Sequence, residues 1–539
     1  MAKKYADKKN VLKNVPKKKL KLAPKKGLKK FMPQEKIQRG PVKIDGKTVL
    51  KEIDRYQFNS NEIPIDVRII KVKEDYVPIY NITISAISKE TEFILEKVRG
   101  ELIKEVDLGA VEVPLENDVT IIEKKFEESI KVLIEKYFPG MEENVSKFLI
   151  AYLINRSLGM GNIEILMDDN NLEEVAINGA KDPVWVYHRK HGWLKTNLMV
   201  KSEEEVKHYS SMIGRKIGRQ INVLSPLMDA NLQTGDRVNA TLAPISNFGN
   251  TITLRKFAAK PWTITDFIKN KTTSFDTAAM IWLGVQYELS ILISGGTATG
   301  KTSMLNVVAN FFPQNQRIIS IEDTREIRLP KYLHWVPMLT RLPNPEGKGE
   351  VSMLDLLVNS LRMRPDRIVV GEIRRKREAE VLFEAIHTGH SVYATVHANN
   401  TQETITRLTN PPIEVPKTML PAISMIVVQY RNRRTGIRRT FQVSEINPDS
   451  STTVILQYDP KKDDLKSVAK SKTMMKTIGE YTGLSLNTLQ KDLKEKVNVL
   501  KWLVKQDIDS VDGVGKVMAE YYSNKENLMK YVHANKKLE

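Results

Sequence analysis

Residues 289–303 read Leu289-Ser290-Ile291-Leu292-Ile293-Ser294-Gly295-Gly296-Thr297-Ala298-Thr299-Gly300-Lys301-Thr302-Ser303. A short apolar run leads into a turn that fits G-x-x-x-x-G-K-[ST] in full, and a helix-like segment follows. Glycines in such a turn let consecutive backbone N–H groups wrap a phosphate, and the helix N-terminus adds its dipole. There Lys301 neutralises phosphate oxygens and Thr302 ligates Mg²⁺. The stretch predicts a nucleoside triphosphate site.

The chain around this turn alternates strand, loop and helix, which is typical of a parallel sheet with crossover helices. The next strand, 317–321, runs into Glu322-Asp323-Thr324-Arg325-Glu326. A carboxylate at the C-terminal edge of the sheet, one strand from the phosphate loop, can polarise a water in line with the γ-phosphate. Glu322 and Glu326 are both candidates for this base.

A second acid follows the apolar run Arg367-Ile368-Val369-Val370, as Gly371-Glu372. A hydrophobic strand that ends in an acid resembles a Walker B element, whose carboxylate holds Mg²⁺ directly or through water. Glu372 is therefore a candidate metal-side acid.

Three of the 8 histidines fall close together, at His387, His390 and His397. A zinc site is not indicated, since the chain has no cysteine and sites made only of histidine are a minority pattern. His397 follows the apolar run 391–396. The end of that strand predicts a position from which His397 can donate to a γ-phosphate.

The first 40 residues carry 15 Lys and Arg but only Asp7 and Glu35 as acids. Prolines interrupt this segment and its apolar residues are sparse, so we expect a disordered tail. It can be a solubility tail or an arm for acidic lipid, nucleic acid or an acidic partner. Without cysteine, an apolar run of membrane-spanning length or a hydrophobic signal core, we expect an intracellular chain whose membrane role is peripheral.

The 539 residues are enough for several domains. Apolar residues at helical spacing predict a helical hairpin over 121–158, broken at Pro139-Gly140. A helix is expected near 203–217, and amphipathic helices over 486–504 and 514–522. Short strands are expected at 163–167, 175–178, 184–187, 238–243 and 251–257. The expected units are a basic tail (1–40), an accessory region (41–120), a helical hairpin with an α+β domain (121–260), a linker (261–275), an α/β domain (276–446) and a helical region (447–539).

Four elements stand in a fixed order: the phosphate loop, the acidic box 321–326, the box 364–374 and the histidine box 388–397. Together they resemble the type II/type IV secretion ATPase superfamily. Upstream, 235–240 and 251–257 are similar to the N-terminal domain of that family, so the resemblance covers roughly 121–445.

The resemblance implies a role for each matching residue. It makes Lys301 and Thr302 the phosphate and Mg²⁺ ligands, and Glu326 the catalytic base. Glu372 becomes the metal-side acid, and His390 and His397 become the histidine-box residues. Arg237 and Arg255 become candidates for reaching the nucleotide from the adjoining domain or subunit. Thr324 stands where the family often has proline, which leaves this turn less rigid.

The resemblance also implies a fold and partners. The fold is a RecA-like α/β motor domain behind a small α+β, PAS-like domain and a helical hairpin, with a helical C-terminal extension. The implied assembly is a homohexamer that uses ATP and Mg²⁺ at the inner face of the cell membrane, with a polytopic platform protein and cytoplasmic accessory proteins. Residues 258–260 would be the hinge. Within the superfamily the chain is most similar to archaeal members that drive the archaellum, and adhesion-pilus relatives share these motifs.

Two other functions remain open. A nucleic-acid translocase of the conjugation type belongs to the same superfamily, and 511–519 resembles a helix-hairpin-helix loop. A glycine pair before an amphipathic helix is more often a plain turn, so nucleic acid is not the expected partner. A nucleotide-gated scaffold that scarcely hydrolyses would require Glu326 to be non-catalytic.

Overall fold

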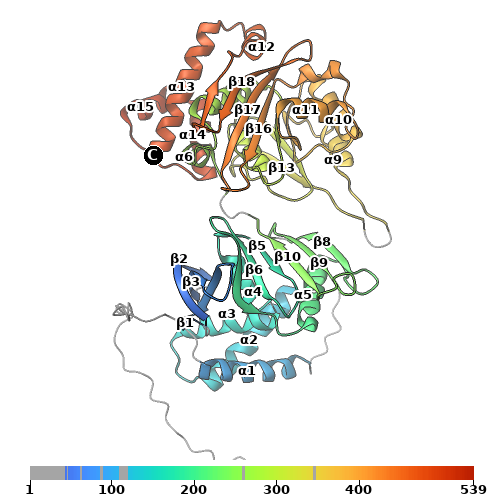
Figure 1. The fold of residues 1–539 in the computed structure, drawn as a ribbon, viewed down its shortest axis with the longest axis vertical. Helices are drawn as coiled ribbons and strands as arrows, with labels where there is room; N and C mark the ends of the chain where they lie inside the picture. The colour runs from blue at the N-terminus through green and yellow to red at the C-terminus, as the bar shows by residue number, and fades with distance from the viewer. Residues whose placement is uncertain are drawn as a thin grey trace, which may run out of the picture.

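The computed structural model describes residues 43–44, 47–60, 63–84, 89–107, 119–158, 160–232, 234–257, 261–343 and 347–538. Figure 1 shows two bodies, each built on a large sheet; the first is described up to residue 257 and the second from residue 261. The basic tail 1–40 and the expected hinge Ala258–Lys260 lie outside the described residues.

The N-terminal body is a ten-stranded sheet in the order β1-β2-β3-β4-β7-β6-β5-β10-β9-β8. Every neighbouring pair is antiparallel except β4 and β7. The strands are β1 (Lys43–Ile44), β2 (Lys47–Ser60), β3 (Ile63–Val72), β4 (Ile79–Ile84), β5 (Leu172–Ile177), β6 (Pro183–His188), β7 (Gly192–Met199), β8 (Leu227–Asn231), β9 (Arg237–Thr241) and β10 (Thr251–Arg255).

The region expected to be a separate accessory part continues this sheet. Strand β4 pairs in parallel with β7, through Ile79 opposite Lys195 and Tyr80 opposite Thr196. The Tyr56 and Tyr80 hydroxyls both donate to the buried Asp169, at 2.6 and 2.7 Å. A buried carboxylate that accepts two such bonds fastens β2 and β4 to the segment between helix α4 (Asn162–Asp168) and β5.

Helices α1 (Lys89–Asp107), α2 (Val119–Tyr137), α3 (Glu143–Leu158) and α5 (Glu203–Lys216) accompany this sheet. The predicted helical hairpin is confirmed: α2 ends two residues before Pro139, and Gly140 takes a positive φ of 77°. The predicted strand 163–167 is wrong, because this segment is helix α4 (Asn162–Asp168). A short apolar run does not separate a strand from a buried helical turn by periodicity alone.

The second body holds a nine-stranded sheet in the order β13-β12-β14-β15-β11-β16-β17-β18-β19. The strands from β13 to β16 in this order are parallel, and β17 to β19 are added antiparallel. The predicted α/β class is confirmed. The strands are β11 (Ile291–Gly295), β12 (Arg317–Glu322), β13 (His334–Leu339), β14 (Arg367–Val370), β15 (Ser391–Val396), β16 (Met425–Arg431), β17 (Arg438–Ile446), β18 (Thr452–Asp459) and β19 (Asp464–Ser467).

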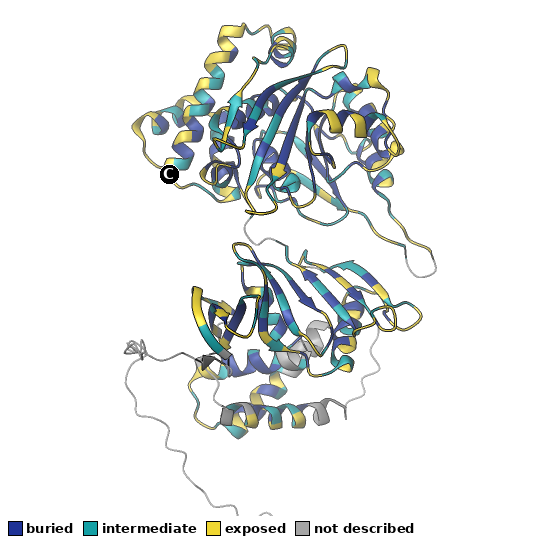
Figure 2. Ribbon diagram, in the orientation of Figure 1, coloured by how far each residue is buried: buried dark blue, intermediate teal, exposed yellow. Residues whose placement is uncertain are grey.

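Helices cover both faces of this sheet, and its central strands β12, β14, β15, β11 and β16 are largely buried, whereas the edge strands β13 and β19 are not (Figure 2). Ile291 and Ile293 join the core under one set of helices, whereas Leu292 joins the core under the other. Such alternation explains the continuous apolar strands. One set is α9 (Met353–Ser360), α10 (Lys376–His387), α11 (Thr401–Thr409) and the 3-10 helix η1 (Lys417–Ala422). The other is α6 (Ile264–Lys269), α7 (Phe275–Gln286), α8 (Lys301–Ala309), α12 (Thr473–Thr482), α13 (Leu486–Lys505), α14 (Val511–Ser523) and α15 (Lys525–Ala534).

The C-terminal helices are part of the second body. The segment expected to be helical from 447 begins with β18 and β19, and its helices start at Thr473. Trp282 of α7 packs at 4.6 Å between ring centroids against Tyr521, and its indole donates to the Tyr522 hydroxyl at 2.9 Å. Lys496 is fully buried and donates to Asp492 at 2.7 Å. Burial lowers the pKa of Lys496 to about 8.

The segment that resembled a helix-hairpin-helix loop is the start of α14. The Tyr332 hydroxyl donates to the Gly515 carbonyl at 2.5 Å. A Cβ on Gly515 would lie 2.5 Å from Pro330 Cγ, so this glycine permits close packing against the α/β domain. Pro330 and Tyr332 therefore cover Gly515, one of the two glycines that were candidates for phosphate binding.

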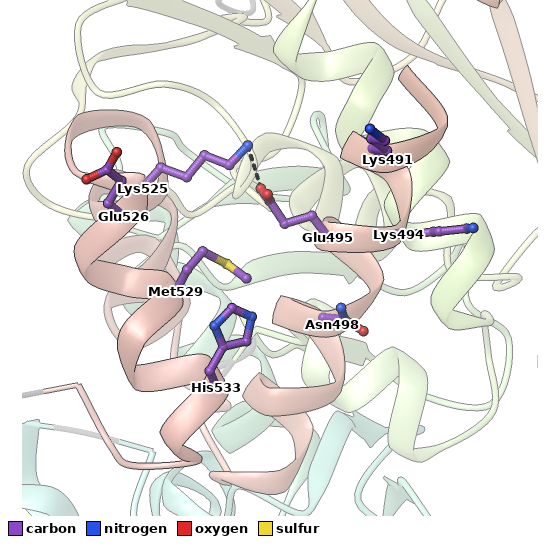
Figure 3. A pocket seen from close by; sticks show the side chains of 8 residues that line it. All are labelled: Lys491, Lys494, Glu495, Asn498, Lys525, Glu526, Met529 and His533. Carbon is purple, nitrogen blue, oxygen red and sulfur yellow. Dashed lines mark ion pairs between the residues drawn. The ribbon is translucent and has the colours of Figure 1, made fainter. Parts of the chain in front are cut away.

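A cavity of about 610 Å³ opens between α13 and α15 (Figure 3). Lys525 crosses it to pair with Glu495 at 2.5 Å. None of its lining residues belongs to the predicted nucleotide site. They are Lys491, Lys494, Glu495, Asn498, Lys525, Glu526, Met529 and His533. Across the described ranges, we find no helix with both the length and the apolar character needed to cross a bilayer.

Candidate nucleotide site

The phosphate loop joins β11 to α8 in the predicted order. Gly300 caps α8 in the left-handed region, with φ 94°. A Cβ on Gly295 would lie 2.4 Å from Thr299 Oγ1, and one on Gly296 would lie 2.9 Å from Asn399 Oδ1. Side chains are excluded at both positions, and this lets the loop backbone approach a phosphate closely.

Lys301 points back over this loop. Its Nζ donates to the Gly296 carbonyl at 3.0 Å. Burial lowers the pKa of Lys301, and the nearby charges of Glu372 and Glu326 oppose that effect. The structure therefore brings the lysine of the loop into the field of both predicted acids. Thr302 and Ser303 follow it in the first turn of α8 and are half-buried.

Glu322 is the buried acid at the end of β12, with 2% of the residue exposed. Its Oε1 accepts the backbone N–H groups of Glu326 at 2.9 Å and Ile327 at 3.0 Å. Its Oε2 is buried and has no hydrogen-bond partner among the described residues. Burial raises the pKa of Glu322 to about 7, although the two N–H groups act in the opposite direction. Glu322 holds the turn that carries Glu326.

Glu326 is the more accessible acid, with 37% of its side chain exposed. Its Oε1 lies 3.8 Å from Arg255 Nη2 at the end of β10. Arg237 of β9 stands opposite Arg255 in register and pairs with Asp229 at 2.6 Å. The structure thus brings two arginines of the N-terminal body to the acidic box of the same chain.

Glu372 follows β14, and its Oε2 accepts bonds from Arg374 Nε at 3.0 Å and Nη2 at 2.8 Å. Arg374 Nη1 also donates to Asp323 Oδ2 at 2.5 Å. Arg374 therefore links Glu372 after β14 to Asp323 after β12, a role that sequence reasoning missed. The basic run Arg374-Arg375-Lys376-Arg377, two positions after the acid, was the available signal.

The two histidines of the histidine box lie at opposite ends of β15. His397 follows the strand, and its pKa is lowered by burial and by the charge of Lys301. His390 precedes the strand, and its Nδ1 lies 3.1 Å from the Ala385 carbonyl oxygen. Six residues of extended chain span about 20 Å, so the predicted site role of His390 is wrong. His387 ends α10 at the same far edge.

The donor set suits Mg²⁺ with a nucleotide. Mg²⁺ takes few protein ligands and completes its shell with phosphate oxygens and water. The Thr302 hydroxyl and the carboxylates of Glu322 and Glu372 are the candidate ligands, and the unpartnered Oε2 of Glu322 is a free acceptor. Within the described ranges no three acidic, histidine or cysteine side chains gather as a metal cage.

The fold and this site define a P-loop protein of the α/β class. Residues 163–436 match the type II/IV secretion system protein family, and the chain belongs to that family. The resemblance inferred from the four motifs is thereby confirmed.

Individual relatives are similar over parts of the chain. An uncharacterized protein of Methanocaldococcus jannaschii is 38% identical over 63% of this chain and 46% of its own length. A putative conjugal transfer protein of Mycobacterium tuberculosis is 32% identical over 46% of this chain and 72% of its own length. The VirB11 ATPase of the Brucella suis type IV secretion system is 22% identical over 52% of this chain and 92% of that chain, with a TM-score of 0.27. The chain spans about half the length of the first M. jannaschii relatives it matches.

The buried Glu322 predicts a pH-dependent stability. Its folded pKa, about 7, lies above the ordinary 4.5, so the folded state binds more protons between these values and stability falls as pH rises through them. The difference corresponds to about 3 kcal/mol. Glu322→Gln cannot titrate at this position, so its free energy of unfolding should not fall in this way. Urea unfolding at pH 5 and pH 8 should therefore show a larger decrease in stability for the wild type than for the variant. Glu384→Gln, an exposed carboxylate on α10, is the control, and an equal pH response in both variants would contradict the assignment.

Proposed function

We propose that the chain is an ATPase that converts hydrolysis into movement of its N-terminal body against its α/β domain. The observation that carries the proposal is the meeting of Lys301, Glu326 and Glu372 at one sheet edge with Arg255 of the other body. Groups from both bodies then surround the same phosphates, so a change in the phosphates alters the contact between the bodies.

The chemistry follows from the positions of these groups. The loop N–H groups and Lys301 hold the β- and γ-phosphates. Glu326, accessible and held by Glu322 through its backbone, accepts the proton of the attacking water. Mg²⁺, held by Thr302 with Glu372 or Glu322, supplies charge neutralisation when bound with the nucleotide. Arg255 withdraws from Glu326 to stabilise charge on the transferred phosphoryl group, as arginine fingers do.

The wider role that we propose is a homohexamer on the cytoplasmic face of the cell membrane. It would act on a polytopic platform protein, with cytoplasmic accessory proteins, to assemble or rotate an archaellum-type filament. The family membership, the relatives from M. jannaschii and the basic segment 1–40, suited to acidic lipid, support this role. Adhesion-pilus assembly and type II secretion are alternatives with the same chemistry.

A conjugation-type nucleic-acid translocase is the alternative of another class, and the M. tuberculosis relative is named a putative conjugal transfer protein. The packing of Gly515 against Pro330 argues against phosphate binding at the start of α14.

The test is the ATPase rate of the full chain alone, with acidic vesicles and with DNA, each with Glu326→Gln as the blank. We expect acidic vesicles to raise the rate several-fold and deletion of residues 1–40 to remove that increase. Neutral vesicles are the matched control. Stimulation by DNA alone, with a steep salt dependence, would replace this proposal with the translocase.

A further inference from the structure

The turn between β16 and β17 is rich in arginine and has no role in the site described above. The Asn432 side-chain carbonyl accepts the N–H groups of Arg434 at 3.0 Å and Thr435 at 3.2 Å, and Gly436 takes a φ of 73°. Strand β16 runs parallel to β11, with Gln429 opposite Gly295. The turn therefore extends beyond the same sheet edge that carries the phosphate loop.

Arg438, at the start of β17, holds the tip of the phosphate loop. Its Nε donates to the Ala298 carbonyl at 3.1 Å, and its Cδ would lie 3.8 Å from a Cβ on Gly300. Ala298 is in the left-handed region, with φ 59°. Residues that carry a Cβ rarely adopt this backbone conformation. The guanidinium thus satisfies a carbonyl in the part of the loop whose backbone is strained.

Arg431 stands opposite Arg438 in register, so both side chains lie on one face of the hairpin. Its Nη2 donates to the Tyr187 hydroxyl on β6 at 2.9 Å. Its Nε is buried and has no hydrogen-bond partner among the described residues. Two cations opposite each other repel. Here Arg438 donates to a carbonyl of the α/β domain, whereas Arg431 donates to a hydroxyl of the N-terminal body.

We propose that the Arg431–Arg438 pair is a relay that links the phosphate loop to the N-terminal body. Phosphates that bind the loop N–H groups fix the orientation of its peptide units, including the Ala298 carbonyl. A change in the position of that carbonyl moves the Arg438 side chain that donates to it. Because Arg431 lies directly opposite Arg438 and carries the same charge, a movement of Arg438 also moves Arg431. Tyr187 packs edge-on against Trp193 at 5.4 Å between ring centroids, so a change in its hydrogen bond reaches β6 and β7. Arg431 and Arg438 are positioning residues, and the relay rests on the proposed nucleotide function.

The test compares nucleotide affinity with the response of the N-terminal body in the full chain. Affinity is measured with a fluorescent ADP analogue and Mg²⁺. The response is the change in hydrogen exchange of peptides over 183–199 on saturation with ADP. We expect a several-fold change in exchange in the wild type. Arg431→Gln and Tyr187→Phe should bind ADP within about threefold of the wild type and lose the response.

Arg438→Gln should weaken ADP binding about tenfold and lose the response even at saturation. Arg433→Gln, which removes an exposed arginine from the same turn, is the matched control and should keep both. A full response in Arg431→Gln and Tyr187→Phe, or no response to bound ADP in the wild type, would overturn the relay while leaving the nucleotide site intact. A wild type that binds no ADP would overturn the proposed function itself.

Discussion

Replacement of Lys301 by alanine is expected to weaken ATP binding by at least about 100-fold and to remove hydrolysis. A charge-assisted hydrogen bond contributes about 1.5–3 kcal/mol, and each 1.4 kcal/mol is about tenfold in affinity. Lys301 is half-buried between the loop and two carboxylates. Its loss therefore also leaves Glu326 and Glu372 unopposed against the negative phosphates. Titration with a fluorescent ATP analogue and a phosphate-release assay measure the two effects.

The loss of a lysine charge needs its own control. Lys417→Ala removes an exposed lysine at the start of η1 in the same domain and should leave both assays unchanged. Lys301→Ala should also retain its unfolding transition, because among the described residues its side chain donates to a single loop carbonyl. Affinity within threefold of the wild type in Lys301→Ala would place nucleotide binding elsewhere in the molecule.

The sequence was most informative where a residue's position along a strand determines its place. The phosphate loop, the acids of the acidic box, Glu372 and His397 each follow a parallel strand. The carboxyl ends of parallel strands meet at one edge of the sheet. That rule was sufficient to bring Lys301, Glu372 and the acidic box to one edge, but it left both Glu322 and Glu326 as candidates, and only the resemblance favoured Glu326. The same rule, applied strictly, would have excluded His390, which precedes β15 instead of following it. There the family resemblance was carried further than the geometry allows.

Contacts between distant segments were beyond sequence reasoning. Arg255 was a candidate only through the resemblance, and nothing in its local sequence indicates the approach to Glu326 at 3.8 Å. Arg431 and Arg438, on the strands that flank the β16–β17 turn, belong to an arginine-rich stretch of sequence, but the sequence does not indicate that their acceptors lie on β6 and in the phosphate loop. The added strands β2 to β4 were missed as part of the larger sheet, because only their pairing with β7 reveals it.

Glu326→Gln is expected to lower kcat by about 10²–10⁴ while ATP affinity stays within about threefold, the effect of removing a general base. The reasoning rests on the contrast between two acids in one box. Glu326 is accessible and faces Arg255, whereas one oxygen of Glu322 is occupied by two backbone N–H groups. A proton acceptor must reach the water, and Glu326 is the acid with the exposed carboxylate.

Glu322→Gln is the matched comparison, because it makes the same chemical change four residues away. The amide oxygen still accepts the N–H groups of Glu326 and Ile327, so we expect a loss in kcat of tenfold or less. Single-turnover phosphate release with both variants, at pH 6 and pH 8, separates the two acids. If the larger loss falls on Glu322→Gln, and the wild-type rate rises with an apparent pKa near 7, then Glu322 is the base. Glu326 would in that case serve to hold Arg255 until the nucleotide arrives.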